Sequence, residues 1–285
     1  MIPASFDYHR ATSVNDALDL LKKHKDASFL AGGHSLLPAM KLRLSTPGHL
    51  IDISGIGALK EIKELKDQIV IGAAVTHHEI EASKPILKKA PLLAQTAAVI
   101  GDIQVRNKGT IGGSLAHADP AADYPAAVLA SGASIRVKGS KGERTIAAAD
   151  FFQDLFMTDL KAGEIILDIR IPLAPPKTGT SYQKFPHPAS RFAVCGCAAS
   201  VTLKGGKCAE ARVGFTGIAN AAFRDSSIEA ALVGKALDEA TVAAACEGAA
   251  SDADLLSDSF AGEDYRRHLA KLFAKKAILA AVEAA

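Results

Sequence analysis

The chain has 285 residues, of which 48% are hydrophobic and 22% are charged, and its formal net charge is +2. This length suffices for one large domain or two modest ones, and the composition is ordinary for a globular protein. The sequence has no apolar run near the roughly 20 residues of a membrane span, no signal-peptide pattern at its start and no basic stripe interleaved with aromatic residues. These features argue against a transmembrane segment and against nucleic-acid binding.

The first hundred residues are predicted to alternate between helices and short strands. Ser13 is placed as the N-cap of a helix, with the acidic Asp16 three residues further on, and apolar residues recur at helical spacing as far as Leu21. Further strands are expected at residues 27–31, 50–53 and 68–74, and helices at residues 36–44 and 91–100.

The central part contains the longest glycine-marked loop, at residues 109–114. Asp119 and Pro120 follow it as an N-cap and a first-turn proline, which predicts a helix that ends near Ser131 and Gly132. Three strands are expected next, at residues 134–138 and 143–146 around a Gly-Ser-Lys-Gly hairpin turn, and at residues 165–171 before Pro172.

The proline-rich segment 172–179 is the best candidate for a domain boundary. Beyond it, two β-rich runs at residues 193–203 and 208–217 are expected to form a hairpin. The remaining segments, residues 225–234, 238–250 and 263–284, are predicted to be helical. This order indicates an α+β protein, because it lacks the regular βαβ alternation of a doubly wound fold.

The four cysteines, Cys195, Cys197, Cys208 and Cys246, contain no C-x-x-C pair. The spacing therefore supports neither a thioredoxin-type motif nor a zinc knuckle, and it is insufficient to ligate an iron–sulfur cluster. Buried thiols in a reducing cytosol are expected instead.

Two glycine motifs are the most informative features of the sequence. Residues 31–35 and 110–114 each pair two glycines with hydroxyl side chains. Paired glycines let the backbone approach an anion and turn successive N–H groups toward it, and the hydroxyls add donors. One such motif alone is better explained as a tight turn, as expected for Gly205 and Gly206. Two converging motifs predict a site for a diphosphate, although composition alone does not identify which dinucleotide binds there.

Other phosphate-binding and hydrolytic motifs fit less well. Gly55-Ile-Gly57 lacks the third glycine of a Rossmann fingerprint and the helix that follows it. Gly33-His34-Ser35 resembles a nucleophile elbow, but Leu37 stands where the elbow needs glycine and too few residues precede it. A nicotinamide site of the Rossmann type and a hydrolase are therefore not supported.

Metal binding is also not predicted. The segments His77-His78-Glu79 and His117-Ala-Asp119 supply ligand types without an established spacing. Adjacent histidines point in different directions on a helix or a strand, so residues 77–79 are expected at a solvated surface or in a capping role.

In their order and context these motifs resemble the FAD-binding medium subunit of aerobic carbon monoxide dehydrogenase and of related xanthine dehydrogenase-type molybdenum hydroxylases. The resemblance covers essentially the whole chain. The segments that carry it are residues 2–8, 31–41 (AGGHSLLPAMK), 109–123 (GTIGGSLAHADPAAD), 163–172 (GEIILDIRIP) and 264–269 (DYRRHL).

The resemblance implies an α+β fold with a two-subdomain FAD-binding domain of the PCMH (vanillyl-alcohol oxidase-like) type. This domain would span residues 1–175, with subdomains at about 1–55 and 56–175. A small C-terminal domain of a sheet and helices, of the kind found in carbon monoxide dehydrogenase flavoproteins, would span residues 176–285.

The resemblance also assigns residues to a non-covalently bound FAD. Residues 32–35 and 110–114 would hold the pyrophosphate, and Asp123, Ile166, Lys184 and Phe192 would meet the adenosine and flavin portions. The full set of predicted cofactor-binding residues is Ala31, Gly32, Gly33, His34, Ser35, Thr110, Ile111, Gly112, Gly113, Ser114, His117, Asp123, Ile166, Lys184 and Phe192. No residue is predicted to be catalytic or to bind a metal.

Several of these assignments have simpler alternatives in the sequence. Asp123 would fix a ribose hydroxyl or complement a helix dipole, and Ile166 would contact adenine or simply be an inward strand residue. Lys184 would stabilise the reduced flavin or be a surface residue of an edge strand, with equal weight. Phe192 stands where relatives often have tyrosine or an aliphatic residue, and Ser114 where many have asparagine.

The function implied by the resemblance is electron transfer. A large partner subunit would oxidise substrate at a molybdenum–molybdopterin centre, and electrons would cross two [2Fe–2S] clusters in a small partner subunit to reach FAD in this chain and then an external acceptor. The assembly would be a dimer of heterotrimers in the cytoplasm, with the inner face of the membrane as a further location.

Two alternatives stay open at this stage. One is a standalone flavin-dependent reductase or oxidase, and the other is a scaffold that has lost flavin and only assembles the complex. The sequence leaves open the substrate (carbon monoxide, an N-heterocycle, an aldehyde or another compound), the electron acceptor and the oligomeric state of the isolated chain.

Overall fold

The computed structural model describes all residues, 1–285. The N-terminal part of the chain forms a small parallel sheet. The strands pair in the order β1-β3-β2, and α1 follows β1 while α2 follows β2. The elements are β1 (Asp7–Arg10), α1 (Val14–Lys23), β2 (Ala27–Leu30), α2 (Leu36–Lys41) and β3 (His49–Asp52). The Ser13 hydroxyl accepts a hydrogen bond from the Asp16 N–H, which confirms the predicted helix start.

The middle of the chain forms a five-stranded antiparallel sheet in the order β4-β5-β10-β6-β7. Its strands are β4 (Ile62–Glu64), β5 (Gln68–Gly72), β6 (Ser134–Gly139), β7 (Gly142–Ala147) and β10 (Ile165–Pro172), with a small ladder of β8 (Phe152–Asp154) and β9 (Met157–Thr158) nearby. The helices are η1 (Gly57–Leu59), α3 (His77–Ala82), α4 (Lys84–Lys89), α5 (Pro91–Ala98), α6 (Ile103–Arg106), α7 (Ile111–His117), α8 (Tyr124–Ala130) and η2 (Ala148–Asp150).

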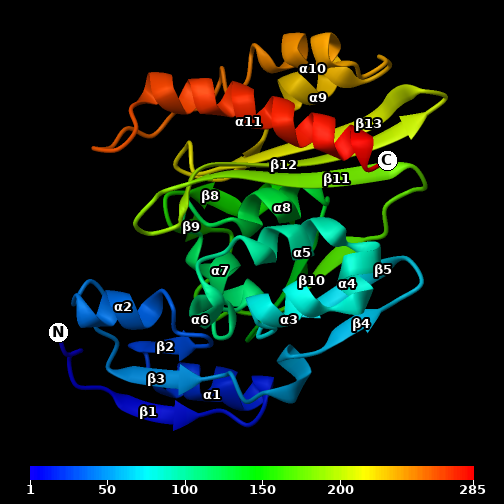
Figure 1. Cartoon of the computed structure of the whole chain (residues 1–285). Coiled ribbons are helices and arrows are strands. Elements are labelled where there is room, and N and C mark those ends of the chain that lie inside the picture. Colours follow the sequence, from blue (N-terminus) through cyan, green and yellow to red (C-terminus); the bar gives the residue numbers. More distant parts are fainter.

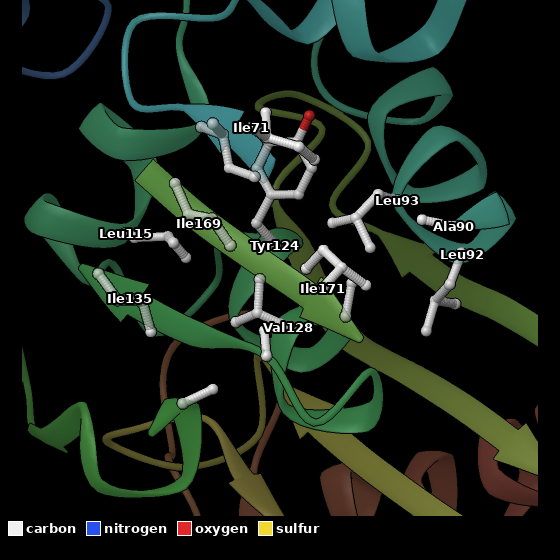
Figure 2. Close-up of a cluster of buried hydrophobic side chains, with 14 of the residues drawn as sticks. Ile71, Ala90, Leu92, Leu93, Leu115, Tyr124, Val128, Ile135, Ile169 and Ile171 are labelled. Atoms are coloured by element: carbon white, nitrogen blue, oxygen red, sulfur yellow. The ribbon is translucent and has the colours of Figure 1, made fainter. Parts of the chain in front are cut away.

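Strand β10 lies between two hydrophobic cores. The pairing of β10 with β6 shifts register between Ile166 and Asp168, so the side chains that face a given side of the sheet change from one set of alternate residues to the other at this point. Ile165 and Leu167 therefore join a nine-residue core shared with the N-terminal sheet, whereas Ile169 and Ile171 belong to the 31-residue central core. Figure 2 shows this central core, with Tyr124 and Val128 of α8 packed near β10.

The C-terminal part forms a third sheet, covered on one face by helices. The strands are β11 (Thr178–Pro186), β12 (Ala193–Lys204), β13 (Lys207–Thr216) and β14 (Phe223–Arg224), paired antiparallel in that order. The helices α9 (Ser226–Leu232), α10 (Glu239–Cys246) and α11 (Glu263–Glu283) share a 25-residue core with the sheet. Gly205 and Gly206 have φ of +61° and +76° in the β12–β13 turn, which confirms that this glycine pair only makes a turn.

The three sheets are stacked along the molecule in chain order (Figure 1). The N-terminal sheet is at one end, the central sheet with its helices is in the middle, and the C-terminal sheet lies between α8 and the long helix α11. This arrangement confirms the predicted α+β class with a C-terminal domain of sheet and helices. No helix, α11 included, has both the length and the apolar character needed to cross a membrane.

Two predicted elements were wrong. Residues 111–114, expected in a loop, form the first turns of α7, and Thr110 is its N-cap. The helix expected directly after Pro120 begins only at Tyr124, because Asp119 instead closes a turn in which its carboxylate accepts the Ala121 N–H. The helical proline is therefore Pro125, in the first turn of α8.

Candidate cofactor site

A cavity of about 560 Å³ opens where the N-terminal sheet, the central sheet and the β11–β12 turn meet. Its size is typical of a site for a small molecule or cofactor. Thirteen of the fifteen predicted cofactor-binding residues line it. The two that do not are Ile111, which is fully buried in the central core, and Lys184, which lies behind Asp123.

The loop of residues 32–35 presents free backbone donors. The N–H groups of Gly32, Gly33, His34 and Ser35 have no hydrogen-bond acceptor anywhere in the protein, and the Ser35 hydroxyl makes no capping bond to α2. Gly33 adopts a φ of +72°, which is accessible to glycine without strain. Successive unpaired N–H groups next to a cavity form an anion-binding concavity.

Gly32 serves a different purpose from Gly33, because it brings the two motifs together. A Cβ at Gly32 would lie 2.0 Å from the Lys108 carbonyl oxygen and 2.8 Å from the Gly109 Cα. Only glycine therefore allows the loop to rest against the backbone that leads into α7.

The second motif is a helix start, and most of its N–H groups already have partners. The Ile111 N–H donates to the Val75 carbonyl at 3.1 Å, and the Gly112 N–H donates to the Ala73 carbonyl at 2.9 Å. A Cβ at Gly112 would lie 2.5 Å from the Ala73 Cβ, so this glycine permits close packing of α7 on the strand end. The motif contributes to the cavity mainly through the surface of Gly113, the Ser114 side chain and the positive end of the α7 dipole.

Asp123 is a buried carboxylate with two protein partners. Its Oδ1 accepts a 2.6 Å hydrogen bond from the Tyr182 hydroxyl, and its Oδ2 accepts a 2.8 Å bond from the Lys184 ammonium group. The Lys184 side chain is only 5% exposed, so the alternative of a surface residue on an edge strand was wrong. Burial raises the pKa of Asp123, and the charge of Lys184 opposes that rise.

His77 lines the cavity and was missed as a site residue. It is 5% exposed, and its Nδ1 has no hydrogen-bond partner. The expected capping role holds for Glu79, which forms a capping box with Thr76, but the expected solvated surface is wrong for His77. Burial lowers the pKa of His77 to about 3, so its imidazole is neutral at pH 7.

Substitution of His77 gives a test of this burial. Below about pH 6.5 the unfolded chain takes up a proton at this histidine, whereas the folded protein does so only at about pH 3. Folded-state stability is therefore lost as the pH falls. We expect a change from pH 7 to pH 5 to lower the free energy of unfolding of the wild-type protein by about 2 kcal/mol more than that of His77→Gln, as measured by urea unfolding.

The matched control is His268→Gln, at an exposed position on α11. It is expected to keep the wild-type dependence of the unfolding free energy on pH. If the unfolding free energies of wild type and His77→Gln changed with pH in parallel, the interpretation of His77 as a buried, neutral imidazole would be contradicted.

The remaining lining divides into an apolar wall and an open mouth. Ile165 and Ile166 of β10 and Leu160 supply apolar surface. Phe192, which is 44% exposed, lies beside Arg191, whose guanidinium donates to the Gly101 carbonyl. Sequence reasoning missed Arg191 because an arginine in a turn carries no motif. His117 also lines the cavity, next to the Phe156 ring at 5.1 Å between ring centroids.

Unpaired backbone donors, flanking hydroxyls and an apolar wall around one cavity are features of proteins that bind a dinucleotide cofactor. Residues 4–174 match the family described as the FAD binding domain in molybdopterin dehydrogenase, and residues 180–281 match the CO dehydrogenase flavoprotein C-terminal domain. The chain therefore belongs to the FAD-binding subunits of the molybdopterin dehydrogenase family, and it is an oxidoreductase subunit with FAD as its cofactor.

Individual relatives agree along the whole chain. The chain is 39% identical to the carbon monoxide dehydrogenase medium chain of Afipia carboxidovorans over 98% of its own length and 97% of the relative's. It superimposes on a chain of carbon monoxide dehydrogenase from Hydrogenophaga pseudoflava with a TM-score of 0.96 at 40% identity, covering 99% of this chain and 98% of that one. For quinoline 2-oxidoreductase from Pseudomonas putida, the TM-score is 0.94 at 33% identity, with 99% of each chain covered.

Proposed function

We propose that this chain holds FAD for electron transfer within a heterotrimeric molybdenum hydroxylase. Electrons would arrive from [2Fe–2S] clusters of a small partner subunit, after substrate oxidation at molybdopterin in a large partner subunit, and would leave to an external acceptor. The observation that carries the proposal is that residues 32–35 line the cavity and that their four N–H groups have no acceptor in the protein. When bound, FAD supplies the redox chemistry, and the chain supplies binding, orientation and electrostatics.

The proposed binding mode gives each predicted residue a task. The donors of residues 32–35 and the hydroxyls of Thr110 and Ser114 hold the diphosphate, with Ala31, Gly113 and His117 forming the adjacent surface. Asp123 meets the ribose, Ile166 the adenine and Phe192 the flavin. Lys184 acts through Asp123, because its ammonium group is bonded to that carboxylate and lies outside the cavity lining. Ile111 and Gly112 support α7 from the core side.

The cysteines support the assignment of the clusters to a partner. All four thiols are free and buried, and burial raises the pKa of Cys195 to about 12. Thiols in this state do not ligate metals readily, because the thiolate is the ligand form. We therefore assign the [2Fe–2S] clusters to a partner subunit. As separate parts of the proposal, molybdopterin also lies in a partner subunit, the assembly is a dimer of heterotrimers, and its location is the cytoplasm or the inner face of the membrane.

We further propose that residues 1–175 form the FAD-binding domain, with subdomains at about 1–55 and 56–175, and that residues 176–285 form the C-terminal domain. The three separate sheets support this division, as does the chain's short passage between β10 and β11. The substrate would be selected by another subunit. Relatives of this chain are named for substrates as different as carbon monoxide and quinoline, which supports that view.

The test is purification of the chain alone and with its large and small partner subunits, followed by absorption spectra, cofactor identification by mass and metal analysis. We expect one FAD per chain, with iron and molybdenum only in the preparation that contains the partners. Reduction of the flavin by the substrate of the complex should require those partners.

Two other outcomes would favour the alternatives. Turnover by the isolated yellow chain with an added electron donor would favour a standalone reductase or oxidase. A fully assembled complex without flavin would contradict electron transfer and leave the assembly scaffold.

A further inference from the structure

Three histidines meet on the N-terminal sheet, away from the cofactor cavity. His9 lies on β1, His24 ends α1, and His49 begins β3. The ring centroids of His24 and His49 are 3.9 Å apart, and those of His9 and His24 are 4.6 Å apart. All three side chains are partly buried, so three residues distant in the sequence share one accessible cluster.

The ring nitrogens of this cluster are close enough to share an ion. One ring nitrogen from each histidine lies within 4.8 Å of the other two, and His9 Nε2 is 3.0 Å from His49 Nδ1. Nitrogen ligands around tetrahedral Zn²⁺ at 2.0–2.1 Å are about 3.3 Å apart, which the His9–His49 spacing matches, and the His24 ring, which lies nearly stacked on the others, would have to rotate to direct its nitrogen at the same ion. His24 Nε2 is a buried atom without a hydrogen-bond partner in the protein, so its coordination would break no existing bond, whereas the hydrogen bond between His9 Nε2 and His49 Nδ1 would be replaced by coordination.

We propose that His9, His24 and His49 bind a divalent transition-metal ion, with Zn²⁺ as the reference ion. Imidazole nitrogens suit zinc, copper and nickel better than magnesium or calcium, which require oxygen ligands. Three protein nitrogens leave the fourth tetrahedral position to water.

A carboxylate lies close to His49 and could accept its second N–H after a small movement. Asp26 Oδ1 lies 3.8 Å from His49 Nε2, on the ring side opposite the Nδ1 atom that approaches His9. Metal-binding histidines commonly donate their second N–H to a carboxylate, which fixes the ring orientation. Glycine at position 48 makes room for this group, since a Cβ there would lie 2.0 Å from Asp26 Oδ2.

The position of the cluster indicates what the ion does. His24 precedes β2 and His49 is the first residue of β3, whereas the cofactor loop 32–35 follows the end of β2. The two sites therefore occupy opposite ends of the parallel sheet. The nine-residue core of this region is small. An ion shared by β1, α1 and β3 would tie these elements together and stabilise the N-terminal sheet, because small cores gain most from cross-links of this kind.

The experiment is calorimetric titration of ZnSO₄ into the untagged, chelator-treated full chain, with Co²⁺ absorption as a second reading of coordination. We expect one ion per chain and a rise in Tm. His24→Ala is expected to weaken Zn²⁺ binding about 100-fold or more, and Asp26→Asn about 10-fold. The matched control, His268→Ala on the exposed face of α11, should bind as the wild type does.

Absence of stoichiometric Zn²⁺ binding by the wild-type chain would overturn the proposal, as would equal binding by His24→Ala and His268→Ala. The cluster would then be three packed imidazoles. If His24→Ala does not fold, His9→Asn serves in its place, and unchanged binding by that variant has the same meaning. FAD content is read in parallel, because an intact flavin site with altered Zn²⁺ binding separates this proposal from the proposed function.

Discussion

Gly32→Ala is expected to weaken FAD binding about ten- to a hundredfold. The added methyl group would lie 2.0 Å from the Lys108 carbonyl oxygen, and the Lys108 and Gly109 N–H groups are both held by the Val105 carbonyl. Neither backbone can move freely, so the loop that carries the four unpaired N–H groups must shift. Overpacking of this kind costs about 1–3 kcal/mol, which corresponds to the stated loss of affinity if it falls on the bound state.

The measurement is FAD titration into apoprotein, followed by flavin fluorescence, together with Tm in the absence of FAD. Gly57→Ala is the matched control, because no atom lies within 4 Å of a Cβ at that position. It is expected to change both quantities little, as surface substitutions usually do. If Gly32→Ala binds FAD as tightly as Gly57→Ala, the loop of residues 32–35 is not the diphosphate site.

The loop of residues 32–35 was predictable because its signal is local. A strand pattern stops at two glycines and a helix pattern begins after Ser35, so the intervening backbone has to turn and expose its N–H groups. The class of fold was predictable for a similar reason, since hydrophobic runs and turn residues mark the strands directly.

The second glycine motif was misread because its conformation is decided by a distant contact. Two adjacent glycines disfavour a helix by propensity, yet α7 forms because Gly112 packs against Ala73 and donates to its carbonyl. Nothing in residues 109–114 reveals Ala73. Tertiary packing overrides the local preference here.

The burial of charged and titratable side chains was equally hidden from the sequence. His77 and His78 read alike as neighbours, but the helix turns one ring into the cavity lining and the other toward solvent. For Lys184 the sequence favoured a flavin contact and a surface position on an edge strand equally. It did not reveal Asp123 at the start of α8, the carboxylate whose charge makes burial of the lysine tolerable.

Lys184→Met is expected to destabilise the protein by about 3–5 kcal/mol at pH 8. It removes one partner of a buried ion pair and leaves the Asp123 carboxylate with only the Tyr182 hydroxyl as its donor. The deficit should shrink at pH 5. Burial already raises the pKa of Asp123, and loss of the Lys184 charge raises it further, so the carboxyl of the folded variant keeps its proton to higher pH than that of the unfolded chain.

Because the pKa of Asp123 is higher in the folded variant than in the unfolded chain, the protonated carboxyl stabilises the folded variant at low pH. This stabilisation is lost as the pH rises through the raised pKa. Urea unfolding of wild type and Lys184→Met at pH 5 and pH 8 measures how the stability deficit of the variant changes with pH.

The double variant Asp123→Asn/Lys184→Met carries no charge at the site. The amide oxygen introduced at position 123 would still accept a hydrogen bond from the Tyr182 hydroxyl, so the double variant should regain stability and lose the extra pH dependence. Equal deficits at both pH values, or a double variant no more stable than Lys184→Met, would show that the pair is not a buried charge pair. FAD affinity of the double variant tests the proposed role of Asp123: the variant lacks the carboxylate that lines the cavity and should bind FAD more weakly, whereas normal binding would show that neither Asp123 nor Lys184 is needed to hold the cofactor.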